Sequence, residues 1–288
     1  MSVATAVARA LGVAVGASHP IGGGDVGEGW RLDLADGRTV YAKTRAGAPV
    51  GLFSAEAAGL RWLAAAGALP VPEVLAVADG PLDDHPVLVL PWIHAGRGTA
   101  RDEEAFGRGL AALHRSGSSS FGFNRDGFIG PLPLDNRPCP SWAAFWWERR
   151  IEPFLRMAVD SGVLDLDHAA IVGELEDELD DLVGPPEPIA RLHGDLWAGN
   201  LHWGDDGRPW LIDPSAYGGR REVDLAMLAL FGGVGARAFS AYHETWPLAA
   251  GHEDRTLLYQ LYPLLVHAVL FGGDYGKRAV AAAELYVA

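Results

Sequence analysis

One eight-residue segment and a carboxylate downstream of it constrain this chain of 288 residues more than any other feature. Residues 193–200 read H-G-D-L-W-A-G-N, so that Asp195 and Asn200 lie five positions apart. A second carboxylate, Asp213, follows a short apolar run. An Asp, an Asn and a later Asp at this spacing are typical of a catalytic loop that is followed by a metal-binding Asp.

The three residue types match the needs of phosphoryl transfer to a hydroxyl group. A carboxylate such as Asp195 can orient the attacking hydroxyl and accept its proton. The amide oxygen of Asn200 and the carboxylate of Asp213 are hard oxygen ligands, which Mg²⁺ prefers and supplements with water. Asp and Asn are also frequent turn formers in polar loops, so the interpretation gains weight only from features elsewhere in the chain.

The composition excludes several other classes of protein. The single cysteine, Cys139, permits neither an internal disulfide nor a Cys-based zinc site. No window of about 18 apolar residues predicts a transmembrane helix, and residues 1–11 do not resemble a signal peptide. The net charge is −14, whereas a protein that binds nucleic acid needs a positively charged surface. We therefore expect a cytoplasmic protein that binds neither nucleic acid nor membrane.

Residues 19–44 predict three strands, and a glycine-rich turn separates the first strand from the second. Gly22, Gly24 and Gly27 fit the pattern G-x-G-x-x-G, which occurs in dinucleotide-binding folds and in kinases. In a dinucleotide site these glycines open a helix, whereas here they open a strand at 30–34, as in a loop that covers phosphates. The alternative is a flexible glycine turn.

The third predicted strand carries Lys43, which stands out in a chain rich in arginine. Of 23 basic residues, only Lys43 and Lys277 are lysines. An arginine side chain ends in a broad, planar guanidinium, whereas a lysine side chain ends in a compact ammonium group on a flexible chain. Lys43 is therefore a candidate for a function that an arginine cannot perform. A helix predicted over 54–66 carries Glu56, which either pairs with Lys43 or faces solvent near the positive end of that helix.

Two further strands are predicted at 73–78 and 86–90, and the second runs into a connection between two lobes. Pro91 in this connection lacks an N–H group. Its carbonyl can still accept a hydrogen bond from an adenine amino group, with the N–H of Ile93 as the matching donor. Pro91 and Ile93 are therefore candidates for binding the base of a nucleotide.

A lobe boundary is predicted after residue 93, where glycines interrupt the apolar pattern. We expect residues 1–93 to form a small nucleotide-binding lobe, and residues 94–288 to form a larger lobe with the catalytic loop, the metal site and the acceptor-binding helices. The acidic run at 174–181 is predicted to be the solvated face of a helix. The helices predicted for the larger lobe cover 102–115, 141–159, 165–183, 222–231, 237–246, 253–271 and 277–287.

Several other residues have structural or open interpretations. His193 is expected to hold the catalytic loop through hydrogen bonds, and Asp224 is expected to anchor the same loop. Arg220 and Arg221 either meet phosphate or pair with nearby acids. Helical spacing predicts a packing role for the aromatic residues Trp142, Phe145, Trp146 and Trp147.

With these residues in view, the chain resembles the fructosamine kinase (ketosamine 3-kinase) family, a branch of the aminoglycoside-phosphotransferase-like, protein-kinase-like enzymes. The motif F-G-F…D-x-F-I-G and the Trp197 inside the catalytic loop are more specific to fructosamine kinases than H-G-D-x-x-x-x-N is. The stretches that carry the resemblance are 22–29, 121–130 with Asn136 and 142–147, 193–200, and 212–214 with 219–227.

The resemblance implies an α+β protein with a two-lobed protein-kinase-like fold, in which a small lobe of β-sheet plus helix faces a larger, mainly helical lobe. It implies ATP- and Mg²⁺-dependent phosphorylation of ketosamines, carried by a small molecule or a protein, which repairs glycated amines because the phosphorylated adduct falls off. Asp195 would be the catalytic base and Lys43, paired with Glu56, the phosphate-binding lysine. Asn200 and Asp213 would be the metal ligands.

The chain departs from the family at two positions and leaves alternatives open. Position 198 is Ala where members often have Ser, and position 25 is Asp where some members have Cys, so redox control through that loop is not expected. Trp197 either stacks on the acceptor sugar or belongs to the core. The alternatives are an aminoglycoside- or choline-like phosphotransferase and a nucleotide-binding protein without catalysis. The sequence leaves the oligomeric state open.

Overall fold

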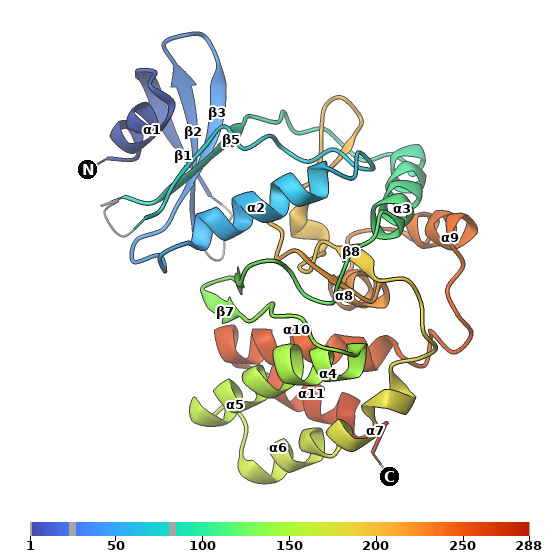
Figure 1. Ribbon diagram of the computed structural model, residues 1–288. Coiled ribbons are helices and arrows are strands. Elements are labelled where there is room, and N and C mark those ends of the chain that lie inside the picture. The colour runs from blue at the N-terminus through green and yellow to red at the C-terminus, as the bar shows by residue number, and fades with distance from the viewer. Residues whose placement is uncertain (1, 23–26, 81–84, 288) are drawn as a thin grey trace.

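The computed structural model describes residues 2–22, 27–80 and 85–287, which form a small lobe above a larger one in the view of Figure 1. The small lobe is built on a five-stranded antiparallel sheet in the order β1-β2-β3-β5-β4. The elements of this lobe are α1 (Val3–Leu11), β1 (Val15–Ile21), β2 (Glu28–Leu34), β3 (Thr39–Thr44), α2 (Leu52–Ala64), β4 (Ala76–Ala78) and β5 (Val87–Pro91).

Both faces of this sheet are buried, because a helix covers each one. Successive side chains of a strand point to opposite faces. In β5, Val87 and Val89 belong to the apolar cluster that contains α1, whereas Leu88 and Leu90 belong to the cluster that contains α2. The uninterrupted apolar run of this strand is therefore explained by burial on both sides, as the sequence predicted.

Helix α1 is the element of the small lobe that the sequence analysis missed. The side chain of Ser2 accepts a hydrogen bond from the backbone N–H of Thr5, which caps the first turn. Gly12 ends the helix with a φ of 69°, a conformation that glycine adopts without strain. The helix is short, and its stability depends on packing its buried residues Val3, Ala6 and Val7 against the sheet.

The larger lobe is mainly helical, and α10 (Thr256–Phe271) lies at its centre. Its side chains Tyr259 and Tyr262 pack against Trp146, and Trp142 stacks on Trp146 with 5.4 Å between ring centroids. The packing role predicted for the aromatic residues at 142–147 is therefore confirmed. The other helices are α3 (Ala100–Arg115), α4 (Trp142–Trp146), α5 (Glu152–Asp160), α6 (Leu166–Gly173), α7 (Leu175–Leu182), α8 (Glu222–Phe231), α9 (Ala236–Thr245) and α11 (Tyr275–Ala283).

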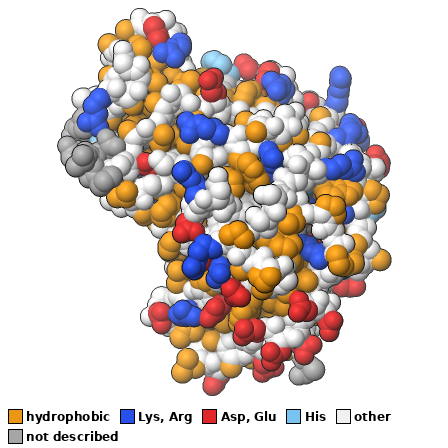
Figure 2. All heavy atoms as spheres, viewed as in Figure 1, with side chains coloured by type: hydrophobic (Ala, Val, Ile, Leu, Met, Phe, Trp, Pro, Cys, Tyr) orange, Lys and Arg blue, Asp and Glu red, His pale blue; other side chains and the backbone are white. Residues whose placement is uncertain are grey.

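Two long helices of the prediction are interrupted in the structure. The helix expected over 141–159 contains a π-helical turn, Trp147–Ile151, between α4 and α5. The helix expected over 165–183 is divided at Glu174 into α6 and α7. In α7, Leu175 and Leu179 are buried while the acidic residues are exposed, so the prediction of a solvated acidic face is confirmed. Figure 2 shows acidic side chains at the lower end of this lobe.

Three pairs of very short strands organise the loops of the larger lobe, and no strand pair was predicted there from the sequence. A strand of three residues shows too little alternation to be recognised. The pairs are β6 (Gly127–Ile129) with β7 (Leu132–Leu134), β8 (Ala190–Leu192) with β11 (Tyr217–Gly219), and β9 (Leu201–Trp203) with β10 (Pro209–Leu211).

The connection between the lobes lies against the end of β9. The N–H of Gly96 donates to the carbonyl of Trp203 at 2.7 Å, and Ala95 forms an isolated bridge with Gly204. The residues that follow β5 are thereby held beside the segment that follows the catalytic loop. Within the described ranges, no helix is both long and apolar enough to cross a membrane.

Candidate active site

A cavity of about 780 Å³ lies between the two lobes, and residues from both lobes line it. Its walls include the ends of β1 and β2, strand β3, helix α2, the connection after β5, the catalytic loop and the start of the segment after Asp213. Gly24 lies outside the described residues. All the other predicted site residues line this one cavity: Gly22, Gly27, Lys43, Glu56, Pro91, Ile93, Asp195, Trp197, Asn200 and Asp213.

A cluster of three charged side chains lies in this cavity. The Nζ of Lys43, from β3, lies 3.0 Å from Oε2 of Glu56, from α2, and 3.1 Å from Oδ2 of Asp213. Burial alone would lower the pKa of Lys43, but the two carboxylates outweigh burial and raise it above its usual value. Burial raises the pKa of Glu56 to about 7, against the attraction of Lys43. Lys43 therefore stays charged and connects the small lobe to Asp213.

The catalytic loop follows β8, and Asp224 of α8 binds the backbone at the start of this loop. The two carboxylate oxygens of Asp224 accept hydrogen bonds from the backbone N–H groups of His193 and Gly194, at 2.8 and 2.9 Å. Gly194 has a φ of 81°, and a Cβ there would lie 2.1 Å from the carbonyl oxygen of Ser215. Only glycine fits this close turn. The prediction that Asp224 anchors the loop is confirmed.

His193 ties the catalytic loop to the residue before Asp213. Its Nε2 is 2.9 Å from the carbonyl oxygen of Ile212, so Nε2 carries the proton and donates. Its Nδ1 accepts the backbone N–H of Asp195 at 3.3 Å. Burial lowers the pKa of His193, which keeps the ring neutral in this arrangement. The prediction that His193 holds the loop through hydrogen bonds is confirmed.

Asp195 and Asn200 face each other across the catalytic loop. The Nδ2 of Asn200 donates to Oδ2 of Asp195 at 2.9 Å and to its backbone carbonyl at 2.8 Å. Burial raises the pKa of Asp195 to about 7, and the hydrogen bond from Asn200 offsets this effect only in part. A carboxylate that titrates near neutral pH is suited to accept a proton from a hydroxyl group.

Asn200 and Asp213 meet the requirements of a magnesium site. Because Asp195 uses the nitrogen of the Asn200 amide, the amide oxygen is the atom that remains for a cation. Both side chains line the same cavity, and both offer hard oxygen atoms. Within the part of the chain that the structure describes, no group of three or more His, Cys, Asp or Glu could hold a metal. The two oxygen donors fit Mg²⁺, which keeps several waters and binds substrate phosphates.

Asp213 has an unusual backbone conformation that the sequence does not reveal. Its φ is 54°, and among the described residues other than glycine it alone has a positive φ. Such strained conformations persist where the surroundings impose them, and they cluster at functional sites. In this conformation the carboxylate of Asp213 contacts Lys43.

Trp197 lies in the wall of the cavity and is only half-buried. Its nearest ring is Phe231 at the end of α8, at 6.4 Å between centroids and 65° between planes. Trp197 is not one of the residues that pack into the apolar clusters of the described chain. The structure thus disfavours the core alternative for Trp197, while its stacking on a sugar stays a prediction.

Residues 121–136, which we call the hairpin segment, form a wall of the cavity that the sequence assigned to no structure. Phe128 of β6 packs with the apolar cluster of α2, and its carbonyl accepts a hydrogen bond from Ser215 Oγ at 2.8 Å. Arg125 donates to the carbonyl of Ser54 at 3.1 Å. In the sequence, this segment was marked by the family motif and by its length as a connection without predicted helix or strand. Further lining residues without any sequence signal are Tyr41, His267, Phe271 and Tyr275.

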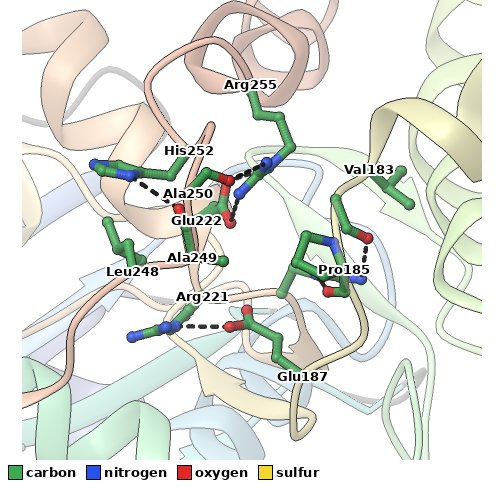
Figure 3. Close-up of polar contacts among 12 residues, drawn as sticks. Val183, Pro185, Glu187, Arg221, Glu222, Leu248, Ala249, Ala250, His252 and Arg255 are labelled. Carbon is green, nitrogen blue, oxygen red and sulfur yellow. Dashed lines mark hydrogen bonds and ion pairs between the residues drawn. The ribbon is translucent and has the colours of Figure 1, made fainter.

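Arg220 and Arg221 are not part of this cavity. Arg221 forms an ion pair with Glu187 at 2.9 Å, and both side chains are nearly buried (Figure 3). Arg220 donates to the backbone carbonyls of Gly184 and Pro185. Of the two interpretations left open for these arginines, pairing with a nearby acid is therefore correct for Arg221, and neither residue lines the cavity.

Comparisons with known proteins agree with this geometry. The family model described as fructosamine kinase matches residues 1–287. A protein named as a probable ketoamine kinase from Synechocystis sp. is 38% identical over 261 residues, which cover 90% of this chain and 86% of that protein. A protein of Thermus thermophilus with the same name is 38% identical over 262 residues, 91% of each chain.

Solved structures give the same result. A crystal structure assigned as a fructosamine-3-kinase from Thermobifida fusca has a TM-score of 0.90 and 44% identity, and the match covers 99% of this chain and 98% of that one. A spectinomycin phosphotransferase in complex with ADP and spectinomycin has a TM-score of 0.59 and 16% identity, which shows a common fold. The chain therefore belongs to the fructosamine kinase family and is a phosphotransferase with the protein-kinase-like fold.

Proposed function

We propose that this protein transfers the γ-phosphate of ATP to a sugar hydroxyl of ketosamines, such as fructosamines or ribulosamines, and thereby takes part in the repair of glycated amines. The observation that carries the proposal is the convergence of the Lys43–Glu56–Asp213 cluster and the Asp195–Asn200 pair on one cavity, in a chain of this family. The aminoglycoside- and choline-like alternatives gain no support beyond a common fold.

The proposal places the nucleotide between the two lobes. Gly22, Gly24 and Gly27 would cover the phosphates, and Lys43 would contact them with a charge that Glu56 holds in place. Pro91 and Ile93 would bind the base through their carbonyl and N–H groups. In this arrangement residues 1–93 act as the nucleotide-binding lobe and residues 94–288 as the lobe of catalysis and acceptor binding.

Mg²⁺, when bound by Asn200 and Asp213, would neutralise charge on the transferred phosphate group. Asp195 would accept the proton of the attacking sugar hydroxyl through its carboxylate, whose pKa of about 7 suits this task. Trp197 would stack on the sugar ring beside this base. Most of the rate enhancement would come from positioning and from charge stabilisation in the cavity.

The proposed acceptor is a ketosamine on a small molecule or on a protein, and the proposed location is the cytoplasm. The test is an ATP-consumption assay with fructosamines, ribulosamines, free sugars, aminoglycosides and choline as acceptors. We expect turnover with ketosamines and loss of that turnover when a chelator removes Mg²⁺. Turnover confined to aminoglycosides or choline would overturn the proposed acceptor, and undiminished turnover in excess chelator would overturn the metal site.

A further inference from the structure

A buried arginine, Arg150, lies behind the hairpin segment and has no role in the chemistry described above. Its side chain has no exposed surface. Among the described residues, no carboxylate forms an ion pair with it. A buried charge without a counterion is unfavourable, and an apolar side chain would pack there at less cost. The presence of a guanidinium at this point therefore needs a reason other than packing.

The guanidinium of Arg150 holds the end of the hairpin segment. Its Nη1 donates to the carbonyl oxygen of Asp135 at 2.9 Å, and its Nη2 donates to Oδ1 of Asn136 at 2.6 Å. Asn136 is 2% exposed and lines the cavity. A planar guanidinium donates from separate nitrogens in a fixed geometry, which the single ammonium of a lysine does not reproduce and an apolar side chain lacks altogether.

Asn136 in turn connects the two sides of the hairpin segment. Its Nδ2 donates to the carbonyl of Arg125 at 3.2 Å, and its backbone N–H donates to Asp126 Oδ1 at 3.1 Å. Its carbonyl accepts the N–H of Phe123 at 2.9 Å. Because Arg150 binds the amide oxygen, it fixes the orientation in which the amide nitrogen reaches Arg125.

The other side of Arg150 contacts the support of the catalytic loop. The guanidinium carbon lies 4.0 Å from the ring centroid of Tyr217 and 4.7 Å from that of Phe145. Such stacking on aromatic faces is favourable for a cation. Tyr217 belongs to β11, and its ring lies close to Gly194, since a Cβ on Gly194 would be 3.1 Å from Tyr217 Cε1. Gly194 precedes the proposed base Asp195.

Arg150 therefore contacts both the hairpin segment and Tyr217, the residue that packs against the catalytic loop at Gly194. We propose that Arg150 is a positioning residue that fixes the hairpin segment, through Asn136, against the catalytic loop, and so sets the affinity for the acceptor. The π-helical turn that carries Arg150 agrees with this role, since such turns are rare and frequent at functional sites. The inference rests on the proposed function and adds to it that the hairpin segment, which lines the cavity, faces the acceptor.

The first variant is Arg150→Met, which keeps the length of the side chain and removes its hydrogen bonds. We expect KM for the ketosamine to rise about tenfold or more, the effect of losing one hydrogen bond to a charged group, while KM for ATP stays within about twofold. Arg150→Lys should give an intermediate KM for the ketosamine, because lysine keeps the positive charge but lacks the planar set of N–H donors. The control is Arg156→Met on α5, whose side chain is 67% exposed and pairs with Glu152, and it should change neither KM.

The second measurement is a double-mutant cycle with Asn136→Ala. If Arg150 acts through Asn136, Arg150→Met should have a much smaller effect on the acceptor KM in the Asn136→Ala background than in the wild type. Fully additive effects would overturn the proposal. So would an equal rise of both KM values together with a lowered thermal midpoint, because that pattern indicates general destabilisation.

Two outcomes separate this inference from the proposed function. If the wild type phosphorylates no ketosamine, the proposed function fails first. If the wild type is active and the Arg150 variants do not change the acceptor KM selectively, only the role of Arg150 is wrong. Should Arg150→Met not fold, Arg150→Lys and Asn136→Ala carry the same test, since an unchanged acceptor KM in both of these would equally overturn it.

Discussion

Replacing Lys43 with arginine keeps the positive charge and changes its shape, so it tests the charge cluster of the cavity directly. The Nζ of Lys43 lies within 3.1 Å of both Glu56 Oε2 and Asp213 Oδ2, and the side chain is only 15% exposed. A planar guanidinium is broader than an ammonium group. We expect it to displace one of the two carboxylates, because it cannot occupy the single point that Nζ occupies between them.

The expected loss follows from these contacts. A hydrogen bond to a charged group contributes about 1.5–3 kcal/mol. Losing one of the two contacts of Lys43 should therefore lower kcat/KM for ATP by roughly 10- to 150-fold. The assay is steady-state turnover with varied ATP at saturating ketosamine, and the thermal midpoint of each variant shows whether it is folded.

Lys277→Arg is the matched control for this experiment. Lys277 is the second lysine of the chain, and its side chain is 84% exposed, with Nζ 3.9 Å from Asp274. An exposed pair of this kind contributes little, so this variant should retain kcat/KM within about twofold. If Lys43→Arg and Lys277→Arg retain comparable activity, the role assigned to Lys43 is refuted.

The remaining predictions concern the base and the acceptor. Asp195→Asn should lower kcat by about 10²–10⁴-fold, with nucleotide affinity near that of the wild type in a binding assay; wild-type turnover would remove Asp195 from the mechanism. The same variant should be more stable than the wild type at pH 7.5, when metal and nucleotide are absent, and this gain should be clearly smaller at pH 5, because it vanishes only below the unfolded pKa of 3.8. Burial raises the pKa of Asp195 from 3.8 to about 7, so the folded state binds a proton that the unfolded state has released between these values, and stability falls as pH rises through this window. Denaturant unfolding at both pH values measures this difference, and an equal gain at pH 5 would contradict the explanation. Trp197→Ala should raise KM for the ketosamine far more than KM for ATP, because an aromatic wall beside the base stacks on sugar. A large fall in the thermal midpoint without a selective change in acceptor KM would instead identify a packing residue, whose truncation typically costs about 3–5 kcal/mol.

The sequence alone predicted the elements that rest on local pattern. The apolar run of β5 and the hairpin of β2 and β3 were visible because side chains alternate along a strand. The catalytic loop was visible because Asp195 and Asn200 contact each other within five residues of chain. Hydrogen bonds between residues this close in the chain depend on the number of residues between them, which can be read from the sequence.

The sequence failed where an element depends on packing with distant residues. Helix α1 is stabilised by the sheet it covers, and the strands of three residues are too short to show a period. The helix predicted over 141–159 was interrupted because a π-helical turn, Trp147–Ile151, carries Arg150 to the hairpin segment. No pattern of apolar residues distinguishes such a turn from a regular helix.

For the site itself, the sequence determined which reactive side chains the chain contains, and the tertiary structure decided which of them come into contact. Lys43, Glu56 and Asp213 were candidates by type, but their contacts join residues 13 and 170 positions apart. The wall formed by the hairpin segment, and the buried position of Arg150 behind it, follow only from the packing of the larger lobe. Residue types and local spacing are properties of the chain, whereas contacts between remote side chains exist only after folding has brought their elements together.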